Sequence, residues 1–326
     1  MRALDLQSEQ YQPTGSMAGR GVRQQLGRPE LDPLALLVRE AAQNSSDARI
    51  PGSDRIGFGV RVRRFSPEER RVLGRRVFAD HPPNLPFDVL GNDDLAAITL
   101  YDYGTTGLGG PTRADRTSDE DDPARDFVDF LRNVGHPPDK ERGGGTYGYG
   151  KAVFYTLSRL RTVCVYTRTA RGKRRFMAAA LGDQYDRTSP GSDVEMFTGR
   201  HWWGEEQADG IVDPVTGAEA EDLARSIGMP SLSDAGETGT VVTVLAPKLG
   251  ESEAGETRTL KDAALFVREV LLWYLWPRMI DTSTCQIDVS VRVDDEELEV
   301  PDPEEYPPLE GFVDAIRAAR AKLDGG

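Results

Sequence analysis

The sequence predicts an α/β protein, because segments with helical periodicity alternate along the chain with segments that have strand periodicity. Residues 32–48 open with an aspartate and a proline, an N-cap acid and a favoured first helical residue, and therefore predict a helix. Residues 56–64 alternate apolar and polar side chains, which indicates a strand. Residues 162–169 and 174–181 flank a short polar turn, which predicts a β-hairpin.

The remaining elements follow from the same signals. A serine and a glutamate form a capping box that begins a helix at 66–77, and a β-branched run predicts a strand at 240–245. Residues 260–279 are largely apolar and predict a long helix. Residues 183–235 look rich in loops, with two short helices at most. The other expected elements are a strand at 95–101, a strand pair at 286–300, and helices at 123–134, 151–159 and 309–323.

Three regions of the chain differ in composition. The 326 residues suffice for one large domain or two medium ones. Residues 1–30 are polar and rich in Gly, Gln and Arg, which is typical of a flexible arm. Residues 31–280 hold most of the predicted core, and we expect residues 281–326 to form a small α+β extension.

Charge and cysteine content narrow the class of protein. The net charge of -14 argues against a broad, nonspecific nucleic-acid surface, although it leaves room for a local basic patch. Cys164 and Cys285 lie far apart in apolar runs, so we expect buried free thiols, as in a reducing compartment. No uninterrupted apolar run approaches the ~20 residues that cross a bilayer. We therefore expect a cytoplasmic protein without membrane contact.

Two groups of aromatic residues carry separate expectations. Trp273, Tyr274 and Trp276 lie at helical spacing and are expected in the core. Trp202 and Trp203 are adjacent in a loop-rich region, and one face of a sheet cannot bury both rings. The pair therefore indicates a half-exposed interface.

Polar residues on the predicted helix 32–48 form the first candidate site. Glu40, Asn44 and Asp47 share a narrow stripe of this helix, beside an apolar stripe that also contains Ser45. A carboxylate beside an amide oxygen suits the activation of water next to a magnesium ion. The alternative is a solvated polar face of the helix.

Asp102 follows the predicted strand 95–101 and precedes a turn that contains Gly104 and Gly107. An acid at this place can accept a hydrogen bond from the exocyclic amine of a nucleobase. The glycines let the backbone approach a flat ring without a clash from Cβ. The alternative is an ordinary surface turn.

Glycines crowd the segment 143–151, which leads directly into an apolar helix. Its backbone N–H groups and the helix N-terminus favour a phosphate, and Lys151 adds positive charge. A P-loop is excluded, because Ala152 stands where Ser or Thr would hold magnesium and residues 137–142 cannot form a buried strand. The alternative is a flexible linker.

Gly239 and Thr240 taken alone are only a turn before a strand. Together and in this order, however, the four segments resemble the motifs of the GHKL superfamily of ATPases. Residues 40–48 are similar to the N-box, residues 102–108 to the G1 box and residues 145–151 to the G2 box. Gly239 and Thr240 take the place of the G3 box.

The resemblance covers roughly residues 30–280 and implies the Bergerat fold. In that fold, a mixed, mostly antiparallel sheet carries helices on one face, and the ligands are ATP and Mg²⁺. Glu40 would orient the attacking water, and Asn44 would hold Mg²⁺. Asp102 would bind the adenine amine, supported through water by Thr240. The other nucleotide contacts implied by the resemblance are Asp47, Ala48, Gly104, Gly107, Leu108, Gly145, Gly148, Tyr149, Gly150 and Lys151, with residues 108–150 as a mobile ATP lid.

Two positions depart from the family pattern. The G1 box usually has one residue between its glycines, but Thr105 and Thr106 both intervene here. Lys151 follows the last glycine of the expected lid, where many members carry an apolar or small residue. It would substitute for a lysine that some relatives supply from a second domain.

The function implied by the resemblance is a slow ATPase that works as a conformational switch. ATP would close the lid and favour a homodimer or a complex with a partner protein. Nucleic acid would be involved indirectly, in DNA transactions or in defence against foreign DNA. Two alternatives stay open. One is a protein kinase of the histidine-kinase or anti-sigma type, disfavoured because residues 1–30 contain no histidine. The other is an ATP-binding scaffold that does not hydrolyse its ligand.

Overall fold

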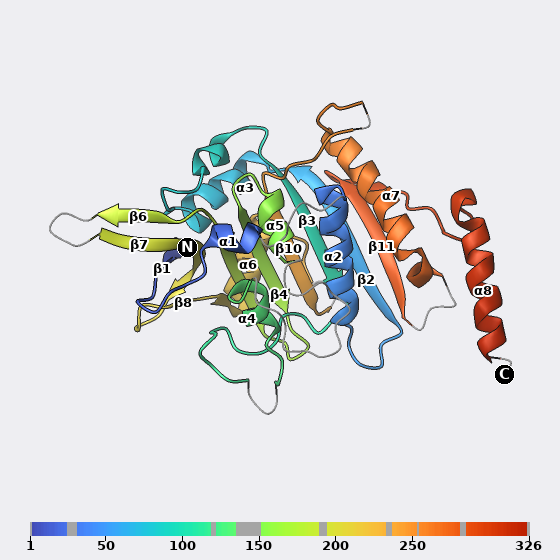
Figure 1. Ribbon diagram of the computed structural model, residues 1–326, viewed down its shortest axis with the longest axis horizontal. Coiled ribbons are helices and arrows are strands. Elements are labelled where there is room, and N and C mark those ends of the chain that lie inside the picture. The colour runs from blue at the N-terminus through green and yellow to red at the C-terminus, as the bar shows by residue number, and fades with distance from the viewer. Residues whose placement is uncertain are drawn as a thin grey trace.

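One large mixed sheet runs through the chain in the computed structural model (Figure 1). The structure describes residues 2–24, 31–118, 122–134, 151–188, 194–232, 237–252, 254–280 and 285–324. The strands of these residues are β1 (Asp5–Gln10), β2 (Arg55–Arg64), β3 (Ala96–Tyr103), β4 (Thr162–Arg168), β5 (Arg174–Leu181), β6 (Tyr185–Thr188), β7 (Val194–Glu206), β8 (Val212–Asp213), β9 (Val215–Thr216), β10 (Gly239–Leu245), β11 (Gln286–Val293) and β12 (Glu296–Leu298).

The strand order is β1-β7-β5-β4-β10-β3-β2-β11-β12, with β6 and β8 paired to β7 and β9 paired to β5. Among the described strands, β11 and β2 form the one parallel pair, and all other pairs are antiparallel. The expectation of a mixed, mostly antiparallel sheet is therefore confirmed.

Helices connect these strands. They are α1 (Gly19–Gln24), α2 (Pro33–Asp47), α3 (Pro67–Val72), the π-helical turn η1 (Leu73–Val77), the 3-10 turn η2 (Phe87–Gly91), α4 (Asp126–Leu131), α5 (Ala152–Leu157), α6 (Gly217–Ser226), α7 (Leu260–Met279), the 3-10 turn η3 (Pro307–Leu309) and α8 (Glu310–Asp324). None of the described helices combines the length and the apolar character that a membrane span requires.

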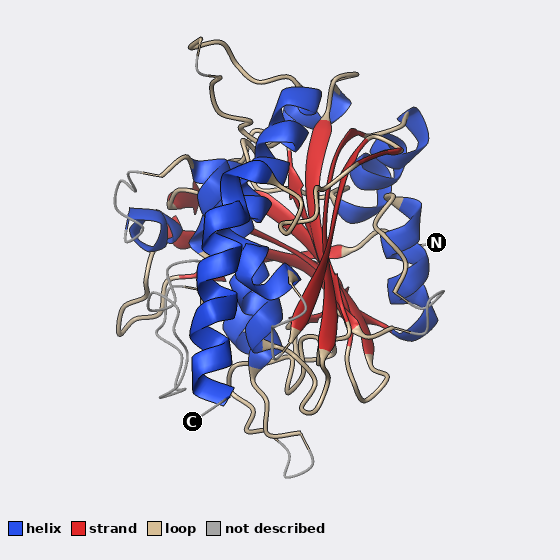
Figure 2. Cartoon of the chain, turned by 90° about the vertical axis from the view of Figure 1, so that its right-hand side faces the viewer, coloured by secondary structure: helices blue, strands red, loops and turns tan. Residues whose placement is uncertain are grey.

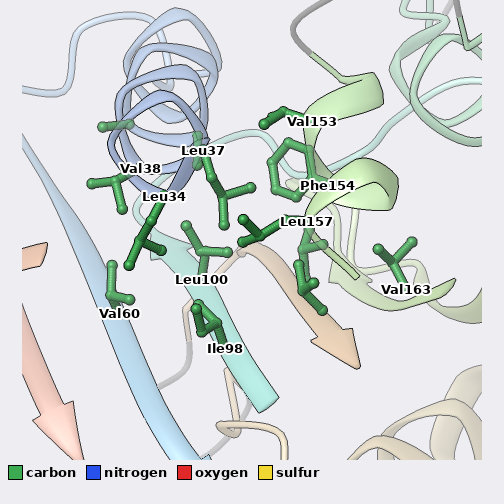
Figure 3. Packing of buried hydrophobic residues seen from close by; sticks show 14 of the residues in the cluster. Leu34, Leu37, Val38, Val60, Ile98, Leu100, Val153, Phe154, Leu157 and Val163 are labelled. Carbon is green, nitrogen blue, oxygen red and sulfur yellow. The ribbon is translucent and has the colours of Figure 1, made fainter. Parts of the chain in front are cut away.

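The first face of the sheet is covered by α2, α5 and α7. Leu34 and Leu37 on α2 are fully buried against Ile98 and Leu100 on β3, with Phe154 of α5 beside them (Figure 3). Such contiguous burial of aliphatic side chains supplies most of the stability of a helix of this length. The core places α2 directly over the end of β3.

The second face of the sheet is also covered, so the expectation of helices on one face is wrong. A second core cluster contains Leu73 and Val77 from η1, Phe87 from η2, and Leu223 and Ile227 from α6 and its end. Figure 2 shows helices on both sides of the strands. The reason is that the strands carry large apolar residues on both faces, and each face has to be shielded from water.

Trp202 and Trp203 on β7 illustrate this arrangement. Trp202 belongs to the first core cluster and Trp203 to the second, and both are buried. Successive residues of a strand point to opposite faces, and both faces are covered here. The expected half-exposed interface is therefore wrong. The expectation that residues 183–235 are rich in loops is also wrong, because the 13-residue strand β7 lies inside the sheet.

The expected arm and extension are both tied to the sheet. Within residues 1–30, β1 pairs with β7 rather than forming a flexible arm throughout. After residue 280, β11 pairs in parallel with β2, register Ile287 to Ile56, so this part begins in the main sheet and not as a separate unit. The expected core position of Trp273 and Tyr274 on α7 is also wrong, because their side chains face away from the sheet and are 57% and 42% exposed.

The start of α2 is fixed by side chains, as its sequence indicates. Asp32 Oδ1 accepts a hydrogen bond from the Leu34 backbone N–H at 2.8 Å, which caps the helix. Asp32 Oδ2 accepts another from Arg258 Nη1 at 2.7 Å. The Arg258 guanidinium also lies 3.8 Å from the centroid of the Phe266 ring on α7. The N-terminus of α2 is thereby joined to the neighbouring helix.

Candidate functional site

Asp102 lies where β3 runs under α2. Side chains alternate along a strand, so Ile98, Leu100 and Asp102 point to the same face, towards the helix layer. The first two side chains belong to the core beneath α2. Asp102 continues that row at the end of the strand and is buried. A carboxylate therefore closes one edge of an apolar interface.

Three donors hold the Asp102 carboxylate. Oδ2 accepts from Ser45 Oγ on α2 at 2.8 Å. Oδ1 accepts from Thr105 Oγ1 at 2.5 Å and from the Thr240 backbone N–H on β10 at 3.0 Å. Burial raises the pKa of Asp102, and the hydrogen bonds from Thr105, Ser45 and Thr240 oppose that rise. The expected water between Thr240 and Asp102 is not needed, because the amide contact is direct.

The polar stripe of α2 continues from this carboxylate towards the helix start. Glu40 is buried, Asn44 is half-buried and Asp47 is exposed. Glu40 and Asn44 are one helical turn apart, which separates them by about 6 Å along the axis. Glu40 Oε1 accepts a hydrogen bond from Nη2 of its neighbour Arg39 at 3.2 Å.

The turn after β3 requires glycine at both expected positions. Gly104 and Gly107 have φ values of 75° and 64°. A Cβ on Gly107 would lie 2.7 Å from the Arg168 carbonyl oxygen on β4. The turn is also bonded to α2, because the Thr106 N–H donates to the Ala48 carbonyl at 2.8 Å.

Thr105 explains the longer spacing between the two glycines. It is completely buried, and its hydroxyl contacts Asp102. Its carbonyl in turn accepts from Thr238 Oγ1 at 2.5 Å. The extra residue is therefore a partner of the carboxylate.

Gly239 brings β10 against β3 at the same point. A Cβ at this position would lie 2.1 Å from the Asp102 carbonyl oxygen, closer than any side chain could tolerate. The absence of a side chain lets the Thr240 N–H reach the Asp102 carboxylate. Glycine followed by threonine is thus a geometric requirement of this site.

The described beginning of the expected ATP lid is attached to the sheet. Leu108 is half-buried, and its N–H donates to Thr167 Oγ1 at 2.9 Å. Arg175 on β5 donates to the carbonyls of Leu108 and Gly110 at 3.0 and 2.7 Å. The beginning of the expected lid is therefore hydrogen-bonded to β4 and β5 in this structure, and its mobility stays a prediction.

Arg113 forms a second attachment. Its guanidinium contacts the Asp213 carboxylate at 2.7 to 3.0 Å through two nitrogens and Asp209 at 2.5 Å. These carboxylates raise the pKa of Arg113 above its ordinary range, chiefly through the hydrogen bonds to Asp213. Bidentate contacts of this kind fix orientation as well as distance.

Arg132, just after α4, forms a third attachment. Nη2 donates to the Val212 carbonyl at 2.5 Å, and the guanidinium stacks 4.8 Å from the Trp202 ring centroid. Burial lowers the pKa of Arg132 to about 10. The Trp202 Nε1–H donates to the Leu131 carbonyl at 2.9 Å, which secures the same helix end.

The glycine-rich segment is described only at its end. Gly145, Gly148, Tyr149 and Gly150 lie outside the described residues. Lys151 precedes α5, and its Nζ donates to the Asp129 carbonyl on α4 at 3.1 Å. The cation expected at the phosphates therefore links the two helices that flank this segment.

Metal and cavity geometry add two observations. The described residues contain no group of three or more His, Cys, Asp or Glu side chains that could hold a metal ion. Two depressions on the described surface are lined by Arg64, Leu260 and neighbouring residues. The depression with the greater number of lining residues also includes Ala96 at the start of β3. Ala96 lies about 20 Å along the strand from Asp102. These depressions are thus separate from the candidate site.

Three buried hydroxyl residues of the site are not evident from the sequence. The sequence pattern predicts Ser45 on the packing stripe of α2 and indicates no role for Thr105 or Thr167. Ser45 is indeed buried, but its hydroxyl reaches Asp102. Thr167 is buried as well and donates to the Gly239 carbonyl at 2.8 Å. A small hydroxyl residue within an apolar stripe was the available signal, because such a group needs a hydrogen-bond partner once buried.

Comparison with known proteins adds no assignment. No protein-family model matches the chain, and no curated protein is significantly similar to it in sequence. The class that fold and site define is an α/β protein with a large mixed sheet and a buried carboxylate between sheet and helix layer.

Proposed function

We propose that this protein is a GHKL-type ATPase that binds Mg²⁺-ATP between α2 and the end of β3 and uses slow hydrolysis as a conformational switch. The observation that carries the proposal is the Asp102 carboxylate, held by donors from α2, from its own turn and from β10. Three of the four candidate segments, all but the glycine-rich one, contribute residues that lie at this carboxylate or on the adjoining polar stripe of α2.

The capacity of Asp102 to accept hydrogen bonds supports adenine as its ligand. A carboxylate oxygen has two lone pairs. Among the described residues, Oδ1 accepts two hydrogen bonds and Oδ2 accepts one. Oδ2 therefore retains capacity for one donor, as the exocyclic amine of adenine would supply. Gly104 and Gly107 support the site by fixing the adjoining turn, because both have positive φ and a Cβ on Gly107 would collide with the Arg168 carbonyl oxygen on β4.

Asn44 and Glu40 support the phosphate chemistry. Magnesium bound to a nucleotide takes most of its ligands from phosphate and water, so a single amide oxygen from Asn44 suffices on the protein side. The missing cluster of acidic ligands among the described residues is compatible with that mode. Glu40 lies one turn away and is the carboxylate placed to orient and deprotonate water. Lys151 supplies positive charge at the start of α5.

A second candidate, a scaffold that binds ATP without hydrolysing it, is favoured by one contact. Arg39 Nη2 lies 3.2 Å from Glu40 Oε1. The Arg39 guanidinium therefore competes with a water molecule for this Glu40 oxygen. Binding is common to both candidates, so the rate of turnover separates them.

The experiment is a measurement of magnesium-dependent ATP binding and turnover in the wild-type protein and two variants. Glu40→Gln is expected to keep ATP affinity and to lose at least about 10²-fold in turnover, the usual contribution of a general base. Asn44→Ala is expected to lose affinity for Mg²⁺-ATP. Gln43→Ala, a half-buried neighbour outside the stripe, is the matched control and should change neither quantity.

Each outcome has a defined meaning. A wild-type protein that binds ATP with turnover equal to the Glu40→Gln variant supports the scaffold. Transfer of labelled phosphate to a protein supports the kinase. A wild-type protein that binds no adenine nucleotide refutes the proposal in all its forms.

A further inference from the structure

Arg39 on α2 connects Glu40 to the neighbouring helix α7. Its Nη2 lies 3.2 Å from Glu40 Oε1, and its guanidinium carbon lies 5.9 Å from the centroid of the Tyr274 ring on α7. Among the described side chains, Arg39 is the one hydrogen-bond partner of the Glu40 carboxylate. The three residues therefore form a chain of contacts that leads from this carboxylate to α7.

Burial decreases along this chain of contacts. The side chains of Glu40 and Arg39 are 8% and 34% exposed, and Tyr274 is 42% exposed. Successive residues of a helix are rotated by 100°, so Glu40 can face the candidate site while Arg39 faces α7. Figure 1 shows α2 and α7 as neighbouring helices over the sheet. The chain thus begins at a buried carboxylate and ends at a ring on the surface.

The Tyr274 ring limits the freedom of the Arg39 side chain. A partly exposed arginine can place its guanidinium in many positions, and holding it in one position costs side-chain entropy. A guanidinium within about 6 Å of an aromatic centroid is attracted by the ring. At exposed sites this attraction changes the population of the held position by a factor of about two to five. The ring therefore favours the position in which Arg39 contacts Glu40.

We propose that Tyr274 is a positioning residue of the ATPase, which holds Arg39 against Glu40 and so restrains the hydrolysis of ATP. This inference rests on the proposed function, in which Glu40 orients the attacking water. While Arg39 stays in place, it competes with that water for Glu40 Oε1. When the guanidinium leaves the ring, Oε1 is released and accepts a hydrogen bond from the water instead. Turnover therefore depends on the fraction of time that Arg39 spends away from Glu40.

The test compares the steady-state kinetics of ATP hydrolysis in the wild type and three variants. Tyr274→Ala should raise kcat by about two- to fivefold, because the ring no longer favours the restraining position. KM should stay unchanged, since Tyr274 lies on α7, outside the proposed nucleotide contacts. Tyr274→Phe keeps an aromatic face and should behave like the wild type. Arg39→Ala removes the competing group itself and should raise kcat by at least as much as Tyr274→Ala.

Two further variants separate this role from a general effect on α7. Trp273→Ala is the matched control, because Trp273 is the neighbouring exposed ring and contacts Phe312 on α8. Its kcat should equal that of the wild type. The second is the double variant Arg39→Ala with Tyr274→Ala. Its kcat should equal that of Arg39→Ala alone, because the ring acts only through the guanidinium.

Three results would overturn the inference while the ATPase function stands: a Tyr274→Ala variant whose kcat does not exceed that of the wild type, an equal rise in Trp273→Ala, or a double variant that is faster than Arg39→Ala. Each is interpreted in a protein whose turnover is lost in Glu40→Gln. Failure of the proposed function looks different. The wild type then binds no adenine nucleotide, or hydrolyses it no faster than Glu40→Gln, and the restraint by Tyr274 is refuted with it.

Discussion

Ser45 and Asp102 are joined by a hydrogen bond of 2.8 Å between Oγ and Oδ2, across the boundary between the helix layer and the sheet. Ser45 Oγ also lies 3.0 Å from the Ala41 carbonyl oxygen one turn earlier on α2. The hydroxyl has a single proton, so it can donate to only one of these oxygens at a time. Which of the two oxygens receives this proton determines how the site responds when Asp102 is replaced.

Asp102→Asn is expected to preserve folding but to abolish recognition of the adenine amine. The new NH₂ group can donate to Ser45 Oγ, whose proton then turns to Ala41, so the free energy of unfolding should change by less than about 1 kcal/mol. The same NH₂ group faces the nucleotide amine as a second donor. Affinity for ATP should fall at least about tenfold, which corresponds to ~1.4 kcal/mol.

Asp102→Ala separates the effect on folding stability from the effect on ATP binding. It leaves the Thr105 hydroxyl and the Thr240 N–H without their acceptor, and should lower the free energy of unfolding by about 1–3 kcal/mol. Urea unfolding and calorimetric titration with ATP measure the two quantities. Asp54→Asn, at an exposed position, is the control for the loss of charge. Equal stabilities of the Asn and Ala variants would contradict the hydrogen-bond assignment.

Gly239→Ala is expected to disrupt the site through the backbone. The new Cβ would lie 2.1 Å from the Asp102 carbonyl oxygen, so β10 and β3 must separate locally. Overpacking of this kind costs about 1–3 kcal/mol of unfolding free energy. Loss of ATP affinity should accompany it, since the Thr240 N–H moves as well. Gly74→Ala, which has open space around its Cβ, should be neutral or slightly stabilising.

His201 is expected to make the protein sensitive to acid. The residue is completely buried, with Nδ1 2.9 Å from Ser8 Oγ, and burial lowers its pKa from 6.5 to about 3. Below pH 6.5 the imidazole of His201 takes up a proton in the unfolded chain but stays neutral in the folded chain. The contribution of the neutral His201 to the free energy of unfolding is therefore complete above pH 6.5 and is lost progressively as the pH falls from 6.5 towards 3.

The measurement is urea unfolding at pH 7 and pH 5 for the wild type and for His201→Gln. The wild type should lose about 2 kcal/mol more than the variant over this interval. His81→Gln, in an exposed loop, should behave like the wild type. Identical slopes for all three proteins would show that His201 is protonated in the folded state.

Arg113→Ala is expected to release the segment that follows the Asp102 turn. The Arg113 side chain is only 15% exposed and contacts Asp213 through two nitrogens, so its loss should cost about 1 kcal/mol. Hydrogen exchange of residues 108–118 should accelerate relative to β3 in the same molecule. Arg2→Ala removes a pair in which Arg2 is 77% exposed and should leave exchange unchanged. Unaltered protection in the Arg113 variant would mean that other contacts hold the segment.

The sequence was sufficient for those elements whose pattern is local. The capped helix α2 and the strand β3 lie where periodicity and N-cap residues predict them, and the carboxylate of Asp102 faces α2 as its position in the strand requires. Direct support from Thr105 was not foreseeable, because it depends on how the turn folds back in three dimensions. In sequence, Thr105 is merely an extra residue between two glycines.

Strand β7 escaped prediction for a different reason. Its residues are buried on both faces, so the polar alternation that reveals a strand is absent, and its glycines resemble those of a loop. The error over Trp273 has the opposite origin. Helical spacing alone cannot tell whether an aromatic stripe faces the sheet or the outside, since that depends on which side of α7 the sheet lies.

The parallel pairing of β11 with β2 determines how the protein can be divided. Without residues beyond 280, the ten-residue strand β2 would become an open border with unsatisfied N–H and C=O groups along its length, which invites aggregation. In the whole chain, β11 covers β2, and the three-residue strand β12, which carries Glu296 and Glu297, covers the end of β11 at Val291 to Val293. Short, charged border strands resist edge-to-edge association. A truncated version intended for nucleotide binding should therefore extend past Leu298.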